Sequence, residues 1–255
     1  MSEAPRHEAG AISIEHVVKR FGHNQVLSGV GLNVPPGCLY GLIGPGASGK
    51  SVLLKIVAGL VRPEGGRVAV DGHDIFAMPD IDLQRFRANF GMLFQNYALF
   101  DYLTVKENIA FPLRRMTRMT EAEISERVAD RLRLVQLPGF EDRTPSGLSG
   151  GQKKRIGVAR ATVMQAPYVL YDEPAAGLDP VTSQRIFNLL RDEQRARGST
   201  VIMVSSDIER LLTVTDRVGM LYRGRLIFDG TTAEAQSSED PYVKQFVHGL
   251  PDGPL

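Results

Sequence analysis

Cysteine and tryptophan are almost absent from this chain of 255 residues, which holds one cysteine, Cys38, and no tryptophan. A single cysteine excludes an internal disulfide. The first ten residues, MSEAPRHEAG, also lack the apolar segment of a secretory signal peptide. We therefore expect the chain to remain in a reducing cytosol.

Long apolar runs and an excess of one charge are missing as well. Glycine, proline or a charge interrupts each apolar stretch, and none approaches the roughly 20 residues that cross a bilayer. Any membrane role must therefore come through a partner. The net charge is only +1, far from the basic excess that binding to nucleic acid usually demands, so we do not expect nucleic acid as a partner.

The composition that remains is that of a globular protein, with 43% hydrophobic and 23% charged residues. The chain is longer than one average domain and shorter than two. We expect one compact unit that contains an inserted lobe.

Short apolar runs alternate with helix-like stretches, which predicts a doubly wound α/β core. Residues 11–34 predict an antiparallel β flap that ends at Pro35, Pro36 and Gly37. Further strands are predicted at residues 38–43, 90–94, 168–171, 201–204, 217–222 and 225–228.

The strand signal disappears between residues 96 and 165, where Ile124, Val128, Leu132 and Val135 form one apolar stripe of a helix. We interpret this segment as an inserted helical lobe. The predicted organisation is listed here: a single domain at 11–250, with its core at about 11–95 and 166–230, its helical lobe at about 96–165, and an amphipathic tail at 231–255.

The strongest motif is a glycine-rich loop between a predicted strand and a predicted helix. GPGASGKS fits G-x-x-x-x-G-K-[ST], whose backbone amides turn inward around a triphosphate. Lys50 would reach the outer phosphates and Ser51 would bind Mg²⁺. The predicted ATP-binding residues are Gly44, Pro45, Gly46, Ala47, Ser48, Gly49, Lys50, Ser51 and Val52.

Two adjacent carboxylates follow the apolar segment YVLY. Neighbouring residues on a strand point to opposite sides, so Asp172 can face a metal ion while Glu173 faces a water that attacks the γ-phosphate. We predict that Glu173 is the general base and that Asp172 binds Mg²⁺.

A second anion cradle is predicted at LSGGQ. A serine hydroxyl and the free amides at the start of the following helix can hold phosphate, although an ordinary serine N-cap would have the same sequence. The residues are Ser149, Gly150, Gly151 and Gln152. Two cradles in one chain mean either two nucleotides or one nucleotide shared across a dimer.

GPGASGKS, Gln95, LSGGQ, YVLYDEP and AGLDP occur in an order and spacing that resemble the nucleotide-binding subunit of ATP-binding-cassette (ABC) transporters. The similarity runs from about residue 12 to residue 230. It implies a P-loop NTPase fold of the ABC ATPase type. It also implies a head-to-tail homodimer in which each ATP lies between the glycine-rich loop of one subunit and LSGGQ of the other.

Three further roles come from this resemblance. Phe21 lies where the family stacks an aromatic ring on adenine, although it could be a plain core residue. Gln95 matches the glutamine that senses Mg²⁺ and the attacking water. Asp179 matches the aspartate that communicates across the dimer, and it could also be a helix N-cap.

One position departs from the family pattern. After VIMV the family usually has a histidine that binds the γ-phosphate, and this chain has Ser206. The histidines of the chain, His7, His16, His23, His73 and His248, are all far from this position in sequence. We expect slow or partner-dependent hydrolysis.

Two segments narrow the resemblance. Tyr97, Leu99, Phe100 and Tyr102 favour a docking groove for a partner helix, with packing against the helical lobe as the alternative. The tail carries apolar residues at helical spacing, and it should pack on its own domain or on a neighbour.

Together the two segments look like the ATPase of the Mla (MCE-associated) phospholipid transport system. That resemblance implies a tail that reaches the partner ATPase, a membrane permease at the inner membrane, an MCE lipid-binding protein and a STAS-domain regulator. Two alternatives stay open: a soluble ABC ATPase without a transport role, and a regulatory cassette that binds ATP without hydrolysing it.

Overall fold

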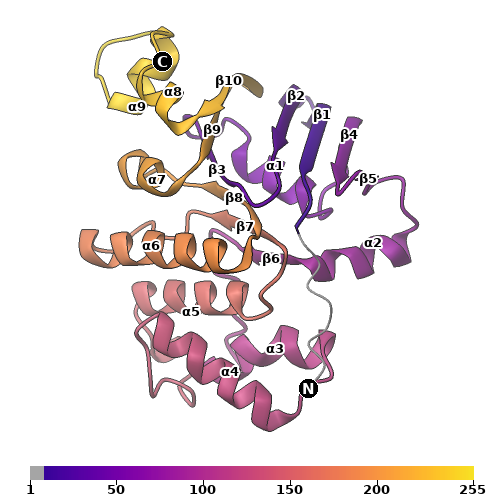
Figure 1. The fold of residues 1–255 in the computed structure, drawn as a ribbon, viewed down its shortest axis with the longest axis vertical. Coiled ribbons are helices and arrows are strands. Elements are labelled where there is room, and N and C mark those ends of the chain that lie inside the picture. Colours follow the sequence, from indigo (N-terminus) through magenta and orange to yellow (C-terminus); the bar gives the residue numbers. More distant parts are fainter. Residues whose placement is uncertain (1–8) are drawn as a thin grey trace.

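The computed structural model describes residues 9–255 and contains two β sheets with helices around them (Figure 1). The predicted lack of a signal peptide concerns the segment MSEAPRHEAG, and residues 1–8 of this segment lie outside the described residues. The strands are β1 Ile12–Phe21, β2 Asn24–Val34, β3 Leu39–Ile43, β4 Gly65–Val70, β5 His73–Asp74, β6 Phe90–Leu93, β7 Tyr168–Asp172, β8 Thr200–Val204, β9 Arg217–Tyr222 and β10 Arg225–Thr231. The α-helices are α1 Lys50–Val57, α2 Asp80–Phe86, α3 Val105–Met116, α4 Glu121–Leu134, α5 Gly150–Thr162, α6 Pro180–Arg197, α7 Ile208–Val214, α8 Thr232–Gln236 and α9 Pro241–His248.

The central sheet has the order β10-β9-β3-β8-β7-β6, and its strands are parallel except for β10. Leu42 of β3 and Asp172 of β7 both pair with Val204 of β8. The loops that follow these three strands therefore leave the same edge of the sheet, which is where an open α/β sheet binds its ligands. This register confirms the α/β P-loop fold predicted from the sequence.

The flap is an antiparallel sheet of order β2-β1-β4-β5. The pairing of β1 with β2 confirms the predicted flap. Two of its strands, β4 and β5, were not predicted, because β4 begins at Gly65 and Gly66 and β5 spans only two residues. Neither segment offers the run of alternating residues by which a strand is recognised in a sequence.

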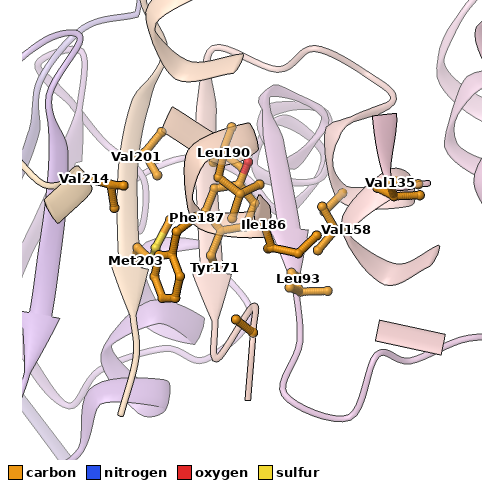
Figure 2. Packing of buried hydrophobic residues seen from close by; sticks show 14 of the residues in the cluster. Leu93, Val135, Val158, Tyr171, Ile186, Phe187, Leu190, Val201, Met203 and Val214 are labelled. Atoms are coloured by element: carbon orange, nitrogen blue, oxygen red, sulfur yellow. The ribbon is translucent and has the colours of Figure 1, made fainter. Parts of the chain in front are cut away.

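Separate hydrophobic cores cover the two faces of the central sheet. Tyr171 and Met203 pack with helices α3 to α7 in the cluster of Figure 2. Their neighbours Leu170 and Ile202 pack on the opposite face with α1 and the flap. This alternation along buried strands explains why the predicted strands read as continuous apolar runs.

The helical lobe is built from α3, α4 and α5, and each of these helices starts with a capping box. Thr104, Thr120 and Ser149 supply the capping side chains. The lobe is joined to α6 by an ion pair of 2.5 Å between Arg131 and Glu193, whose side chains are 6% and 19% exposed. We propose that the domain spans residues 11–250 and that the helical lobe spans about 96–165, as predicted from the sequence.

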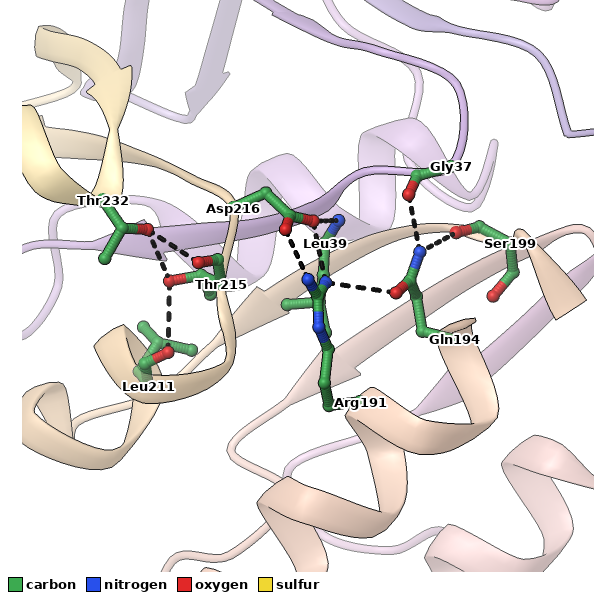
Figure 3. A network of polar contacts seen from close by, with 9 residues as sticks. All are labelled: Gly37, Leu39, Arg191, Gln194, Ser199, Leu211, Thr215, Asp216 and Thr232. Carbon is green, nitrogen blue, oxygen red and sulfur yellow. Dashed lines mark hydrogen bonds and ion pairs between the residues drawn. The ribbon is translucent and has the colours of Figure 1, made fainter. Parts of the chain in front are cut away.

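A polar network lies at the amino-terminal end of β3, on the side of the sheet opposite the carboxyl ends of its parallel strands (Figure 3). Asp216 accepts the Leu39 amide at 2.8 Å and both terminal nitrogens of Arg191 on α6. Burial favours a higher pKa for Asp216, but the Arg191 bonds and the Leu39 amide outweigh it and hold that pKa below its usual range. The network fixes the far ends of β3 and α6, the elements that carry the glycine-rich loop and Asp179 at their other ends.

The C-terminal tail folds onto its own chain. Val243 of α9 is fully buried, and the Tyr242 ring lies 5.2 Å from that of Tyr222 at the end of β9. Helix α9 also contacts α8. Of the two predicted possibilities, packing on its own domain or on a neighbour, the tail in this structure packs on its own domain.

Candidate functional site

The glycine-rich loop connects β3 to α1 and has the backbone shape its motif requires. Gly44 has a φ of 141°, and a Cβ there would lie 2.0 Å from the Leu221 carbonyl oxygen, so only glycine fits. Gly49 and Ala47 also have positive φ angles, of 105° and 58°. Successive turns of this kind direct the backbone amides to one side and create an anion-binding concavity.

Lys50 lies inside this loop. Its ammonium donates to the carbonyls of Gly44 and Pro45 at 2.7 and 2.8 Å, and to Ser48 Oγ at 3.3 Å. Burial lowers the pKa of Lys50, while Glu173 and Asp172 act to raise it. The ammonium is thus bound to the loop that a triphosphate would occupy, and phosphate oxygens can replace these carbonyls as its acceptors.

The end of β7 brings a carboxylate to the start of α1. Asp172 is 4% exposed, and its Oδ1 accepts the Ser51 hydroxyl at 3.1 Å. Burial raises the pKa of Asp172 above its usual value. The Ser51 hydrogen bond and the nearby lysines act in the opposite direction, but their effect is smaller. Two of the three predicted metal ligands, Ser51 and Asp172, are therefore in direct contact although they lie 121 positions apart in sequence.

Glu173 follows directly and has a strained backbone, with φ at 55°. Its amide donates to the Val204 carbonyl at 3.0 Å, and its Oε2 accepts the Ser206 hydroxyl at 3.0 Å. A cavity of about 260 Å³ opens beside both side chains. Ser206, which stands where the family usually has a histidine, therefore contacts the predicted general base.

Two more of the predicted site residues, Gln95 and Phe21, are exposed, whereas Val52 is partly buried. Gln95 lies just after β6 with an exposed side chain. Phe21 is 52% exposed at the end of β1 with Lys19 Nζ 5.1 Å from its ring centre, so the interpretation as a plain core residue is wrong. Val52 lies in the first turn of α1.

LSGGQ forms the start of α5. Ser149 is the N-cap and Gln152 completes the capping box, which confirms the N-cap interpretation, and Gly150 is exposed in the first turn. Figure 1 shows α5 at the helical lobe and α1 beside the flap, so the two cradles belong to different parts of the chain.

Asp179 is the N-cap of α6, as the alternative interpretation predicted. Its Oδ1 accepts the amides of Val181 and Thr182 at 3.0 and 2.9 Å. Hydrogen bonds from the side chain and the amide of Thr182, with that from the Val181 amide, hold the pKa of Asp179 below its usual range.

Part of the aromatic segment after Gln95 is exposed, as a docking groove would require, and part of it packs against the helical lobe. Tyr102 is 80% exposed, while the Phe100 ring lies 5.0 Å from that of Phe111 on α3. Buried Asn108 holds the segment by accepting the Phe100 amide and donating to three carbonyls. Sequence reasoning missed Asn108, because one asparagine inside a helix carries no signal of such a role.

Comparisons with known proteins identify the family of the chain. The sequence profile of the ABC transporter family matches residues 27–176. The chain belongs to the ABC transporter family. It is the ATPase subunit of such a transporter.

Similar proteins cover almost the whole chain. A protein of Mycobacterium leprae named "Probable ribonucleotide transport ATP-binding protein mkl" is 39% identical over 96% of this chain and 71% of its own length. The "Intermembrane phospholipid transport system ATP-binding protein MlaF" of Escherichia coli is 32% identical over 97% of this chain and 92% of its own. A dimeric ATP-binding cassette bound to ADP and Pi in a post-hydrolysis state superposes with a TM-score of 0.82, at 30% identity, over 87% of this chain and 98% of that one.

The ABC cassette described here has no helix within residues 9–255 that combines the length and apolar character of a membrane span.

Proposed function

We propose that this ABC ATPase powers the transport of phospholipid or a similar hydrophobic substrate. The relative named for intermembrane phospholipid transport matches 97% of the chain. The relatives above are named as transport proteins, which argues against a soluble ATPase without a transport role.

The contact of Ser51 with Asp172, directly before Glu173, carries the proposal of hydrolysis. Residues 44–52 would hold the phosphates of ATP and Phe21 its adenine. Ser51, Gln95 and Asp172 supply only oxygen donors, which suits Mg²⁺, and such sites usually complete the coordination with water and substrate phosphate. These side chains would hold the ion beside the phosphates, where it would supply positive charge that offsets their negative charge. Glu173 would orient the attacking water and accept its proton.

We propose that two copies assemble head to tail. The exposed LSGGQ helix start of one subunit would complete the nucleotide site of the other, and Asp179 would contact the partner. The relative solved in a post-hydrolysis state is dimeric.

The exposed aromatic surface around Tyr102 and Phe111 would receive a cytoplasmic helix of the membrane permease. The chain would then lie at the cytoplasmic face of the inner membrane. An MCE lipid-binding protein and a STAS-domain regulator complete the proposed complex.

Affinity purification of the full-length chain from detergent-solubilised membranes of its host tests this assignment. We expect a multi-span permease to copurify, together with an MCE protein. Tyr102→Ala should reduce permease recovery, because it removes the most exposed aromatic side chain of the segment. Recovery of soluble partners alone would contradict the proposal.

Ser206 favours a second candidate function, a regulatory cassette that binds ATP without turnover. The Ser206 hydroxyl is bound to Glu173 and is not a direct substitute for a histidine that binds phosphate. The main proposal predicts that Ser206→His raises the rate of ATP hydrolysis by about 10-fold or more, because it restores a donor to the transition state.

Phosphate release from the copurified complex measures this effect. Ser206→Ala is the matched control, since it removes the hydroxyl without adding an imidazole, and it should bring no gain. A Ser206→His complex no faster than its parent would count against the assignment.

A further inference from the structure

A buried lysine lies two residues after LSGGQ. Lys154 of α5 is 4% exposed, and its ammonium donates to the Ala176 carbonyl at 2.6 Å, in the loop between Glu173 and Asp179. Burial lowers the pKa of Lys154, and the Glu173 carboxylate is the charge that opposes this shift. A cation on the LSGGQ helix is thus placed against the loop of the predicted base.

The same ammonium also contacts the segment after Gln95. It lies 5.2 Å from the centre of the Tyr97 ring, within the range of a cation–π interaction. One turn further along α5, a Cβ on Gly157 would lie 2.9 Å from Leu93 and 3.6 Å from the Tyr97 Cβ, so glycine allows this close approach.

Arg160 completes the attachment of α5 to this segment. Its guanidinium donates to the carbonyls of Tyr97 and Ala98 at 2.6 and 2.8 Å. Both residues have left-handed backbones, with φ of 59° and 51°. Strained conformations persist where surrounding contacts hold them, and here α5 supplies those contacts.

Stability alone gives little reason for a charge at this position. A buried cation loses its hydration, and an apolar side chain of similar size is often equally or more stabilising. The Lys154 ammonium nevertheless joins the LSGGQ helix, the loop after Glu173 and the segment after Gln95 at one point.

We propose that Lys154 is a positioning residue that couples the LSGGQ helix to the catalytic loop of its own subunit. When the partner's nucleotide contacts the start of α5, a movement of this helix is passed by Lys154 to Ala176 and Tyr97, and so to Glu173 and Gln95. The inference rests on the proposed roles of Glu173 and LSGGQ. It adds a connection, within one subunit, between two nucleotides. One is the nucleotide of the partner's glycine-rich loop, which contacts LSGGQ, and the other is the nucleotide in the subunit's own glycine-rich loop.

Lys154→Met in the full-length chain, copurified with its membrane partners, tests the proposal. We expect kcat for Mg²⁺-ATP hydrolysis to fall about 10-fold, the size of a typical coupling effect, while KM for ATP changes less than about 2-fold. We expect Tm to stay within about 3 °C of the parent, because methionine fills the same volume without a buried charge. A lower Tm with normal kcat would show a purely structural lysine and overturn the proposal.

Tyr97→Leu provides a second variant that does not alter the buried charge. It should also lower kcat without changing KM, and the double variant with Lys154→Met should be no slower than the slower single variant. Independent, multiplicative losses would contradict the coupling. Lys244→Met, which removes a lysine from an exposed ion pair on α9, is the control and should match the parent.

Glu173→Gln is measured in the same assay to separate two kinds of failure. If Glu173→Gln hydrolyses ATP normally, the proposed catalytic site is wrong. If Glu173→Gln is inactive and Lys154→Met behaves like the parent, only the coupling through Lys154 is wrong.

Discussion

Replacing Glu173 with glutamine is expected to slow ATP hydrolysis by about 10²- to 10⁴-fold, the usual contribution of a general base, while ATP binding is retained. The amide can keep the hydrogen bond from the Ser206 hydroxyl, so the loop should hold its place. It cannot accept the proton of the attacking water. Lys50, Ser51 and Asp172 are unchanged, and the nucleotide should therefore remain bound in a persistent dimer.

Single-turnover hydrolysis and size-exclusion chromatography with Mg²⁺-ATP measure the two parts of this expectation. Glu239→Gln is the matched control, because among the described residues, 9–255, its exposed carboxylate pairs only with Lys244. A Glu173→Gln chain with parental turnover would remove Glu173 from the mechanism.

Lys50→Met is expected to reduce both ATP affinity and hydrolysis, the latter by about 10²- to 10³-fold. The ammonium donates to loop carbonyls and to Ser48, so its removal takes away the donor for the outer phosphates and also loosens the loop. This variant differs from Glu173→Gln, because it should fail to form the ATP-dependent dimer.

Binding of a fluorescent ATP analogue, followed by titration with ATP, measures the loss of affinity. Lys244→Met is again the control for the removal of a lysine. Parental affinity in Lys50→Met would mean that the glycine-rich loop does not hold the triphosphate.

The central strands could be predicted because each is buried on both faces. Tyr171 and Leu170 belong to different cores, so β7 is a short run of apolar residues bounded by polar ones. The glycine-rich loop was also recognisable, because the steric demand at Gly44 is local. Features that depend on short-range chemistry can be recognised in a single sequence.

Contacts between distant segments could not be predicted in this way. Lys154 and Tyr97 are far apart in sequence, and a lysine in the first turns of a helix is usually solvated, so nothing indicated its burial. The contact of Ser206 with Glu173 depends on the register of β7 against β8. The resemblance to the ABC family placed Ser206 near the γ-phosphate, and only the three-dimensional packing shows that it contacts Glu173.

The helix cap at Asp179 has a consequence for assembly. Both amide bonds of the cap are accepted by Oδ1. The cap thus orders the side chain before any second subunit arrives. Ordering such a side chain during association usually costs about 0.5–1.5 kcal/mol. Asp179 is already restrained, so encounter of the two subunits can proceed with a smaller entropic barrier at this position.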